Sequence, residues 1–269
     1  MRLHRKRRVM LVTGASGFLG RHLVRGPASN DWEIIAPSSL SMDVTNRARV
    51  LDTITGWKPN VVVHLAYRKE RRVIVDGSRH VAEAAVAAKA RLVHMSTDAL
   101  FAGRPTPYRE LDVPDPVTEY GVDKRDAERL VASIAPNAVI IRTSLMYGTD
   151  HLSEFQQQMQ RSLHTGRSPM TFFTDEFRCP AHADDVAAAI STVAQQRKIN
   201  GILHVAGPER LSRLDYALAC ARHLGASAPR FPSATIAESG VTRPGDVTLD
   251  SAHAVSLGIT CRSMSDALV

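Results

Sequence analysis

Apolar and polar positions vary along the chain in a pattern that predicts strands and helices in turn. Short apolar runs rich in β-branched residues are typical of buried strands, and they lie at 8–14, 32–37, 60–66, 91–97, 137–144 and 201–207. Apolar positions recur at helical spacing over 17–26, 81–90, 123–135, 151–163, 183–196 and 213–225. Continuous apolar strands that alternate with helices indicate a parallel sheet covered by helices on both faces.

This alternation predicts an α/β protein with a Rossmann-type, doubly wound parallel sheet and a small C-terminal substrate-binding lobe. The alternation is regular up to residue 148 and looser beyond it. We therefore expect a basic tail over 1–8 and a dinucleotide-binding domain over 9–148. Residues 149–269 are expected to form mainly the substrate-binding lobe, with some segments that return to the sheet.

The composition is that of a soluble globular protein, with 44% hydrophobic and 23% charged residues in a chain of 269. No apolar run reaches the roughly 20 residues that cross a bilayer, and the run "VMLV" after the basic start is too short for a signal peptide. Three widely spaced cysteines indicate reduced thiols rather than disulfides or a zinc site. The sequence therefore predicts a cytoplasmic protein with no membrane partner and no bound metal.

The net charge of +7 reflects 34 Lys and Arg against 27 Asp and Glu. Much of the excess lies at the start of the chain, at Arg2, Arg5, Lys6, Arg7 and Arg8. A nucleic-acid surface would need a basic stripe interleaved with aromatic side chains, and aromatics make up only 5% of the residues. We therefore expect a solvated basic tail and no nucleic-acid partner, while positive charge elsewhere would suit a phosphorylated metabolite.

The first predicted strand runs into "TGASGFLGRH", in which Gly14, Gly17 and Gly20 recur every third position. Glycines at this point let the backbone turn tightly and let a pyrophosphate approach the amides of the following helix. Because the array follows a strand and opens a helix, it predicts a dinucleotide site. The alternative is a tight strand-to-helix turn that binds nothing.

The end of the second strand bears on the choice of nicotinamide cofactor. NAD sites usually place an acid there for the ribose 2′-hydroxyl, whereas this chain has "IIAPSSL", with Ser38 and no carboxylate. Arg21 directly follows the last glycine and could meet a 2′-phosphate. These residues favour NADP(H) and leave NAD(H) open.

Eight segments together resemble the extended short-chain dehydrogenase/reductase family. They are "TGASGFLG", "MDVTN", "KPNVVVHLA", "VDGSRHVAEAA", "MSTDALFAG", "EYGVDKRDAERLV", "IIRTSLMYG" and "RCPAHADDVA", and they occur in the family's order. Within that family, "MSTDALF", "IIRTSLMYG" and "RPGDVTLDSAHAVSLGI" are most similar to the dTDP-4-dehydrorhamnose reductase group.

The resemblance implies a role for each matching position. It implies cofactor contacts at Gly14, Ser16, Gly17, Phe18, Leu19, Gly20, Arg21, Ser38, Asp43, Val44, Leu65, Ala66, Tyr67 and Lys124, with Asp43 and Val44 beside the adenine. It implies catalytic roles for Thr97, Tyr120 and Lys124, and substrate contacts at Ser96, Asp98, Ala99, Arg178 and Arg243.

Chemistry supports the pair Tyr120 and Lys124 on independent grounds. Reduction of a ketone by hydride leaves an alkoxide that needs a proton and electrostatic support. A tyrosine gives up its proton well only if its pKa of about 10 is lowered, and a lysine one helical turn away on the same face does this. Thr97 ends a strand where open parallel sheets bind ligands, and its hydroxyl could orient the carbonyl. The alternative is a surface helix with an exposed lysine and a half-buried tyrosine.

Two arginines bear on the substrate. Arg178 and Arg243 match positions where sugar-nucleotide members of the family hold a diphosphate, and guanidinium groups bind phosphate oxygens in bidentate fashion. The alternative is a salt bridge, for example between Arg178 and Asp175 or Asp184.

The chain departs from the family pattern in three ways. Ala99 replaces the acid that dehydratases of the family carry, which argues against a dehydratase, and it also replaces the tyrosine usual in the reductase group. Ile74 replaces the family's active-site asparagine, and the segment after Leu65 and Ala66 is unusually short. A proton relay through that position would have to run differently.

We therefore expect an NADP(H)-dependent reductase of a keto-sugar, with a nucleotide-linked sugar as its small-molecule substrate. One alternative is a nucleotide-sugar 4-epimerase, which uses the same residues but retains its cofactor. Another is a non-catalytic, cofactor-binding regulatory subunit like the β subunit of methionine adenosyltransferase, which resembles the same reductase group. The resemblance also admits a homodimer, for which the residues themselves give no evidence.

Overall fold

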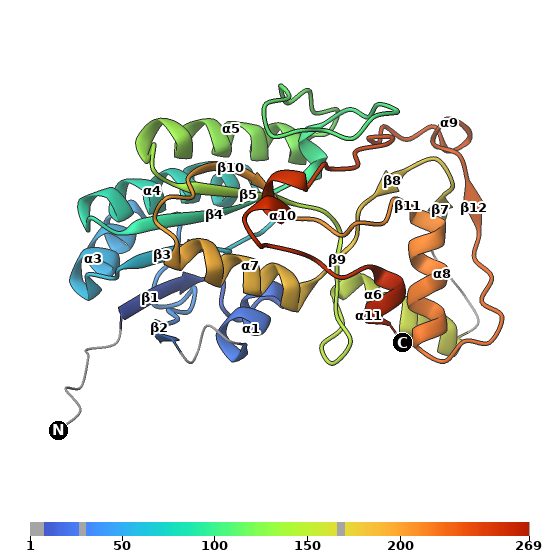
Figure 1. The fold of residues 1–269 in the computed structure, drawn as a ribbon, viewed down its shortest axis with the longest axis horizontal. Helices are drawn as coiled ribbons and strands as arrows, with labels where there is room; N and C mark the ends of the chain where they lie inside the picture. The colour runs from blue at the N-terminus through green and yellow to red at the C-terminus, as the bar shows by residue number, and fades with distance from the viewer. Residues whose placement is uncertain (1–7, 27–30, 166–169, 269) are drawn as a thin grey trace. The chain divides into compact units, whose positions relative to one another are not determined.

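The computed structural model describes residues 8–26, 31–165 and 170–268 (Figure 1). Of the predicted basic tail over 1–8, residues 1–7 lie outside this described part. The chain divides into two compact units, each made of three segments. Unit 1 comprises Met1–Ser96, Asp126–Ile141 and Ala187–Ile202, and unit 2 comprises Thr97–Arg125, Arg142–Val186 and Leu203–Val269.

Unit 1 is built on a six-stranded sheet with the order β10-β5-β4-β3-β1-β2. The strands are β1 (Arg8–Thr13), β2 (Trp32–Ile35), β3 (Val61–His64), β4 (Arg91–Thr97), β5 (Val139–Thr143) and β10 (Gly201–His204). The pairs β1–β2, β1–β3 and β3–β4 run parallel. Since the strand order reverses at β1, ligands of such a sheet bind beyond the carboxyl ends of β1 and β3.

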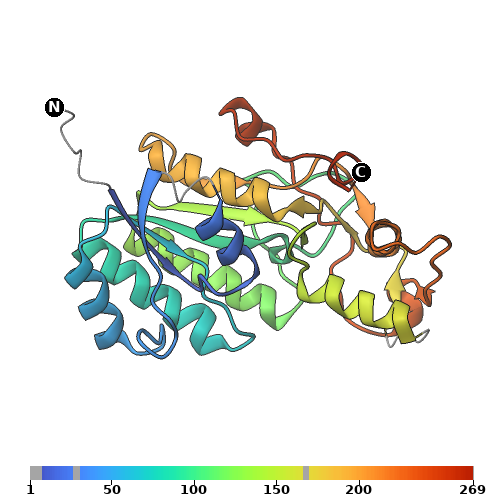
Figure 2. The same ribbon diagram turned by 90° about the horizontal axis from the view of Figure 1, so that it is seen from below.

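Helices cover both faces of this sheet, as Figures 1 and 2 show. The helices α3 (Arg47–Trp57), α4 (Gly77–Ala87) and α5 (Glu119–Ile134) lie on one face, while α1 (Phe18–Arg25) and α7 (Ala183–Gln195) lie on the other. Because both faces are covered, the run Val61–Val63 is almost wholly buried. One core cluster of unit 1 includes Leu11, Val50, Ile54, Val62, Val81, Leu92, Val131 and Ile140.

In its described residues, unit 2 holds three short strand pairs. These are β8 (Phe177–Arg178) with β11 (Leu211–Ser212), β7 (Phe172–Phe173) with β12 (Ser233–Ala234), and β6 (Met146–Tyr147) with β9 (Ala181–His182). Its other helices are η2 (Asp98–Leu100), α6 (Glu154–Thr165), α8 (Arg213–His223), α9 (Ile236–Ser239), α10 (Ala252–Ser256) and α11 (Met264–Ala267).

Hydrophobic clusters among the described residues stabilise unit 2. One packs Tyr147 and Met159 against Tyr216 and Cys220 of α8. Another contains Leu100, Phe101, Tyr108, Val247 and Leu249, with the rings of Phe101 and Tyr108 stacked at 3.9 Å between centroids.

The α/β fold with its doubly wound sheet is confirmed, and each strand and helix expected from the hydrophobic pattern is present. The short strands β6, β7, β8, β9, β11 and β12 were not expected. The functional division into a dinucleotide domain over 9–148 and a substrate lobe over 149–269 stays a prediction, because it concerns what each part binds. Within the described ranges, no helix combines the length and apolar character needed to cross a membrane. All three cysteines are unbridged.

Candidate active site

The glycine turn after β1 leaves no room for side chains. Gly14 has a φ of 69°, and a Cβ built on it would stand 2.6 Å from the amide nitrogen of Ala66. A Cβ on Gly20 would stand 2.3 Å from the carbonyl oxygen of Gly14. The structure thus brings the predicted residues Gly14, Gly20, Leu65 and Ala66 together at the strand-order reversal, where backbone can approach a pyrophosphate closely.

The amino-terminal end of α1 is open to an anion. Its N-cap is Gly17, which offers no side-chain hydrogen bond, and the first turn contains no acidic residue. Ser16 and Gly17 are exposed, Phe18 is half-buried, and Leu19 is buried, so Leu19 could serve a cofactor only through its backbone. The first amides of a helix lack internal partners and carry partial positive charge, which suits a phosphate.

A buried hydrogen-bond chain holds this turn against β3. The amides of Leu65 and Ala66 donate to the Thr13 hydroxyl, at 3.2 and 3.1 Å. Thr13 Oγ1 lies 2.8 Å from His64 Nδ1, and His64 Nε2 lies 3.2 Å from Ser78 Oγ. Ser78 in turn donates to the carbonyl of Ile74 at 2.6 Å.

This pattern assigns the proton of His64 to Nε2, which donates to Ser78, so that Nδ1 accepts from Thr13. Thr13, His64 and Ser78 were not singled out from the sequence. Their signal would have been the register that pairs Thr13 with His64 in neighbouring parallel strands.

The region after β2 contains hydroxyl groups and no carboxylate before Asp43. Ser38 and Ser41 are exposed, and their hydroxyl oxygens lie 3.3 Å apart. Arg21 is exposed, and its Nε donates to the carbonyl of Ser16 at 2.9 Å. The predicted NADP-selecting groups are therefore solvent-accessible.

The residues predicted beside the adenine differ in exposure. The exposed Asp43 carboxylate accepts bonds from the Thr45 amide and hydroxyl, both at 2.9 Å, and these bonds hold the pKa of Asp43 below its ordinary value. Val44 is buried and packs against Gly77. Tyr67 is 53% exposed.

The shortened segment after Ala66 leads into a π-helix, η1 (Arg72–Asp76), directly before α4. Ile74, which occupies the family's asparagine position, is 4% exposed within this π-helix. A wider helical turn accommodates the irregular entry into α4, and such turns are frequent at functional sites.

The catalytic candidates of unit 2 lie on two adjoining backbone segments, the turn after β4 and the first turns of α5. Thr97 caps η2, since its Oγ1 accepts the Ala99 amide at 3.2 Å, and it donates to the Asp98 carboxylate at 3.3 Å. Tyr120 and Lys124 are half-buried on successive turns of α5. A Cβ on Gly121 would stand 2.2 Å from the Ala99 carbonyl oxygen, so the first turn of α5 packs directly on the Thr97 turn.

Asp98 and Ser96 are both buried. The Asp98 carboxylate accepts the Ser144 hydroxyl at 2.6 Å, and its Oδ2 lies 3.6 Å from Arg178 Nε. Burial raises the pKa of Asp98, against the opposing effects of Arg178, Ser144 and Thr97. Ser96, in unit 1, has a buried Oγ with no hydrogen bond to any described residue.

The two predicted arginines converge on one carboxylate. Glu176 accepts Arg178 Nη2 at 2.9 Å and Arg243 Nη2 at 3.1 Å, and Arg243 Nε also contacts it. Arg213 Nε lies 3.9 Å from the same carboxylate. The ion-pair alternative for Arg178 therefore exists, but with Glu176 and Asp98 in place of Asp175 or Asp184. Glu176 was missed, although its spacing of two residues from Arg178 is typical of one strand face.

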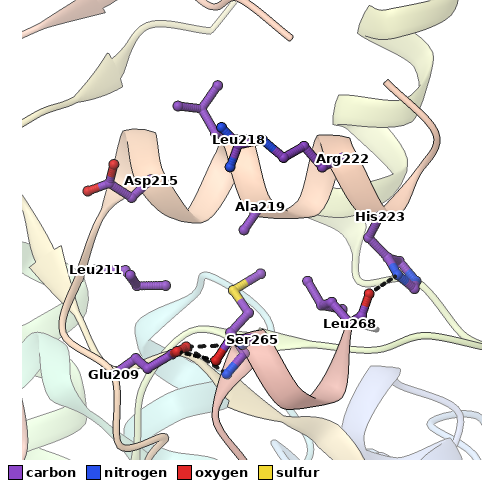
Figure 3. A pocket seen from close by; sticks show the side chains of 10 residues that line it. Glu209, Leu211, Asp215, Leu218, Ala219, Arg222, His223, Ser265 and Leu268 are labelled. Carbon is purple, nitrogen blue, oxygen red and sulfur yellow. Dashed lines mark hydrogen bonds between the residues drawn. The ribbon is translucent and has the colours of Figure 1, made fainter. Parts of the chain in front are cut away.

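A separate hollow of about 580 Å³ lies between α8 and α11 (Figure 3). Its wall includes Leu218, Arg222, His223 and Leu268, and the carboxylate of Glu209 accepts the Ser265 hydroxyl there at 2.7 Å. None of the predicted site residues lines this hollow. Throughout the described ranges, this hollow included, no three His, Cys, Asp or Glu side chains gather as metal ligands.

Comparisons with known proteins agree with this architecture. Residues 7–268 match the family model described as RmlD substrate binding domain. dTDP-4-dehydrorhamnose reductase from Aggregatibacter actinomycetemcomitans is 30% identical over 228 residues, which cover 78% of this chain and 77% of that protein. Methionine adenosyltransferase 2 subunit beta from Pongo abelii is 28% identical over 289 residues, covering 95% and 84% respectively.

Among solved structures, dTDP-4-dehydrorhamnose reductase from Bacillus anthracis in complex with NADP is similar to this chain with a TM-score of 0.87. The two chains are 24% identical, and the match covers 97% of each. This likeness shows that they share a fold.

Proposed function

We propose a function from one premise: the chain belongs to the RmlD substrate binding domain family, whose model matches residues 7–268. The family resemblance expected from the sequence is thereby confirmed, and the chain is an NAD(P)-dependent oxidoreductase of this family. Its relatives include dTDP-4-dehydrorhamnose reductases. We infer that it reduces the keto group of a nucleotide-linked sugar with NADPH.

The observation that carries this proposal is the contact between the first turn of α5 and the turn that follows β4. Because Gly121 packs on the Ala99 carbonyl, Tyr120 begins its helix beside the turn that Thr97 caps. A phenol in the first turn of α5, a hydroxyl on the turn against which it packs, and an ammonium one helical turn further along α5 are the groups that carbonyl reduction needs.

In the proposed mechanism, the Tyr120 phenol donates a proton to the oxygen of the substrate carbonyl. Lys124, four residues along the same helix, favours the phenolate and so assists this transfer. Thr97 orients the substrate oxygen. The reduced nicotinamide, when bound, supplies the hydride.

The glycine turn of unit 1 fits a dinucleotide. Only glycine can occupy positions 14 and 20 as they are folded, and the uncapped end of α1 is suited to the pyrophosphate. We propose that the exposed Arg21 and Ser38 favour NADP(H) over NAD(H), since no carboxylate precedes Asp43 after β2. The related reductase from Bacillus anthracis was crystallised with NADP, which supports this choice.

An anionic substrate fits the charges around Glu176. Three guanidiniums and the two carboxylates of Asp98 and Glu176 leave one positive charge in excess. Of the three arginines, Arg243 is the most exposed, with 37% of its side chain accessible. We propose that it meets the diphosphate of the nucleotide-linked sugar.

The test is NADPH oxidation, followed by absorbance, with a panel of nucleotide-linked 4-keto sugars. We expect turnover with at least one of them, and its loss in Tyr120→Phe with an unchanged dissociation constant for NADPH. Full turnover in Tyr120→Phe would contradict the mechanism. An epimerase would instead purify with tightly bound cofactor and act without added NADPH.

A second candidate function is that of a regulatory subunit, because methionine adenosyltransferase subunit beta matches 95% of this chain. Stoichiometric co-purification with a partner enzyme, together with no NADPH oxidation across the whole panel, would favour it. The unbridged cysteines fit a reducing compartment, which supports the proposed cytoplasmic location. Sedimentation of the purified chain would test the proposed homodimer.

A further inference from the structure

A chain of buried charges leads from the surface of unit 2 to the hydroxyl of Thr97. Arg243 contacts Glu176, Glu176 accepts Arg178 at 2.9 Å, and Arg178 lies 3.6 Å from Asp98. Asp98 in turn accepts the Thr97 hydroxyl at 3.3 Å. These contacts link a predicted substrate arginine to a predicted catalytic residue within one unit.

Most N–H groups of Arg178 are already directed at protein oxygens and are not available to a substrate. Its side chain is 5% exposed, and its Nη1 donates to the carbonyls of Phe177 and Gly245, at 2.9 and 3.1 Å. Its Nη2 donates to Glu176, and its Nε faces Asp98. A guanidinium carries five N–H groups in a fixed fork, so four of them are already directed at protein oxygens.

Arg243 differs in each of these respects. Its side chain is 37% exposed, and its Nε and Nη2 both engage Glu176. Its Nη1 has no hydrogen bond to a described residue, and its guanidinium lies 4.9 Å from the ring centroid of Phe173. It is therefore held in place while one edge of the fork stays available.

Asp98 connects the buried ion pairs to Thr97 through a hydrogen bond. Its Oδ1 accepts from Thr97, and its Oδ2 accepts from Ser144 at 2.6 Å. Ser144 is itself fixed, because its oxygen accepts the Cys179 amide at 3.1 Å. An ionised carboxylate only accepts hydrogen bonds, so as long as Asp98 is charged the Thr97 proton is directed toward it.

We propose that Arg178 is a positioning residue for Thr97, acting through Asp98, and that Arg243 alone of the two arginines contacts the anionic part of the substrate. The proposal rests on the reductase function proposed above. Arg178 serves as internal counter-ion, which favours the charged form of this buried carboxylate against the cost of burial. Asp98 then fixes the rotamer of the Thr97 hydroxyl at the end of β4.

Loss of Arg178 would invert this hydrogen-bond pattern. Without its counter-ion, a buried carboxyl takes up a proton and becomes a donor. Among the described residues, the charged or titratable groups that interact with Asp98 are Arg178, Glu176 and Cys179. Since Glu176 disfavours the charge on Asp98 and the Cys179 thiol lies in the same buried surroundings, neither can replace Arg178. The Thr97 hydroxyl would then accept from Asp98 and lose its set orientation.

The test compares Arg178→Met with Arg243→Ala in steady-state kinetics. Arg178→Met should lower kcat by about a hundredfold, as expected when a reacting group is misplaced, and leave the KM for the nucleotide-linked sugar within about twofold. Arg243→Ala should raise that KM by roughly tenfold through a lost charge-assisted contact. Arg178→Lys keeps the charge and should recover part of kcat. Arg222→Ala, on the exposed face of α8, is the matched charge control.

The pH profile separates positioning from plain structural support. In Arg178→Met, kcat should increase with pH as Asp98 ionises, and this increase should lie at higher pH than in the wild type, where Arg178 favours the charged carboxylate. A KM raised as much in Arg178→Met as in Arg243→Ala, with kcat intact, would overturn the proposal and make Arg178 a substrate contact.

A second measurement tests the proposal even if a variant folds poorly or the protein shows no reductase activity. A double-mutant cycle compares the melting temperatures of Asp98→Asn, Arg178→Met and the double variant. The decrease in melting temperature of the double variant should be smaller than the sum of the decreases of the two single variants, because the double variant leaves no unpaired buried charge. Additive losses would overturn the pairing of Asp98 with Arg178. If the wild type oxidises no NADPH with any keto-sugar, the proposed function fails, and the cycle still tests this pairing.

Discussion

The α-carbon of Gly121 lies so close to the carbonyl oxygen of Ala99 that a methyl group on it would stand 2.2 Å from that oxygen. The same methyl group would stand 2.7 Å from Cβ of Pro116. The glycine between Tyr120 and Val122 is therefore what allows the first turn of α5 to touch the turn that Thr97 caps. The short "EYGVDK" segment joins the two halves of the proposed acid–base site through its backbone as well as through its side chains.

Gly121→Ala should separate these two turns. We expect kcat to fall by at least about tenfold and stability to fall by about 1–3 kcal/mol, because overpacking against backbone costs more than the helix gains from alanine. The dissociation constant for NADPH should stay within about twofold, since the glycine turn of unit 1 is untouched. Activity, thermal unfolding and cofactor titration measure the three effects.

The control is Gly56→Ala in the last turn of α3, where an added Cβ meets nothing within 4 Å. This change should stabilise the protein by about 0.5 kcal/mol and leave kcat unchanged. If Gly121→Ala and Gly56→Ala had the same kcat and stability, the contact between Gly121 and Ala99 would have no role in activity or folding.

Thr13→Val tests the hydrogen-bond chain behind the cofactor turn. Valine keeps the shape of threonine but removes the acceptor for the amides of Leu65 and Ala66 and the donor to His64. We expect the NADPH dissociation constant to rise roughly tenfold and stability to fall by about 1–3 kcal/mol, because the Ala66 amide loses its acceptor while the Leu65 amide retains the Thr13 carbonyl. Isothermal titration and thermal unfolding provide the two values.

Two companion variants make that result specific. Thr13→Ser retains the hydroxyl and should bind NADPH within about threefold of the wild type. Thr192→Val removes a single local bond to the Ala188 carbonyl on α7 and should leave cofactor affinity unchanged. NADPH affinity unaltered in Thr13→Val would show that the chain through His64 does not organise the turn.

Arg21→Ala tests the proposed preference for NADP(H). The guanidinium is exposed and anchored to the Ser16 carbonyl at 2.9 Å, so its loss should leave the fold intact. We expect the dissociation constant for NADPH to rise roughly tenfold through a lost charge-assisted contact, and that for NADH to change by less than about twofold. Equal losses for both cofactors would mean that Arg21 holds something other than the 2′-phosphate. Arg129→Ala, on an exposed part of α5, controls for the change in net charge.

The sequence predicted the sheet because burial leaves a direct mark on composition. The run at Val61–Val63 is apolar at consecutive positions because both faces of a parallel strand are covered. The glycine turn was readable for a similar reason, since a backbone that approaches another backbone admits no side chain. Such local signals account for most of the fold.

Contacts between segments that are distant in the sequence could not be predicted, because they have no local sequence signal. Asp98 and Arg178 are 80 positions apart, and nothing in their neighbours pairs them. The π-helix over Arg72–Asp76 has no recognisable sequence pattern that would distinguish it from the start of α4. The two-residue strands of unit 2 are too short for a period-two pattern to appear.

The pH dependence of stability should report on Asp98. Burial raises the folded-state pKa of this carboxyl above its ordinary 3.8, so the folded protein retains the proton to higher pH than the unfolded chain. The contribution of Asp98 to stability is therefore greatest below pH 3.8 and is lost as pH rises through the raised pKa. In thermal unfolding between about pH 4 and pH 8, the wild type should lose stability relative to Asp98→Asn as pH rises, since other groups titrate alike in both.

Ser144→Ala removes a hydrogen bond that favours the charged form of Asp98 and should extend this loss of stability to higher pH. If the stability of the wild type instead increased with pH relative to that of Asp98→Asn, the attraction of Arg178 would outweigh the cost of burial.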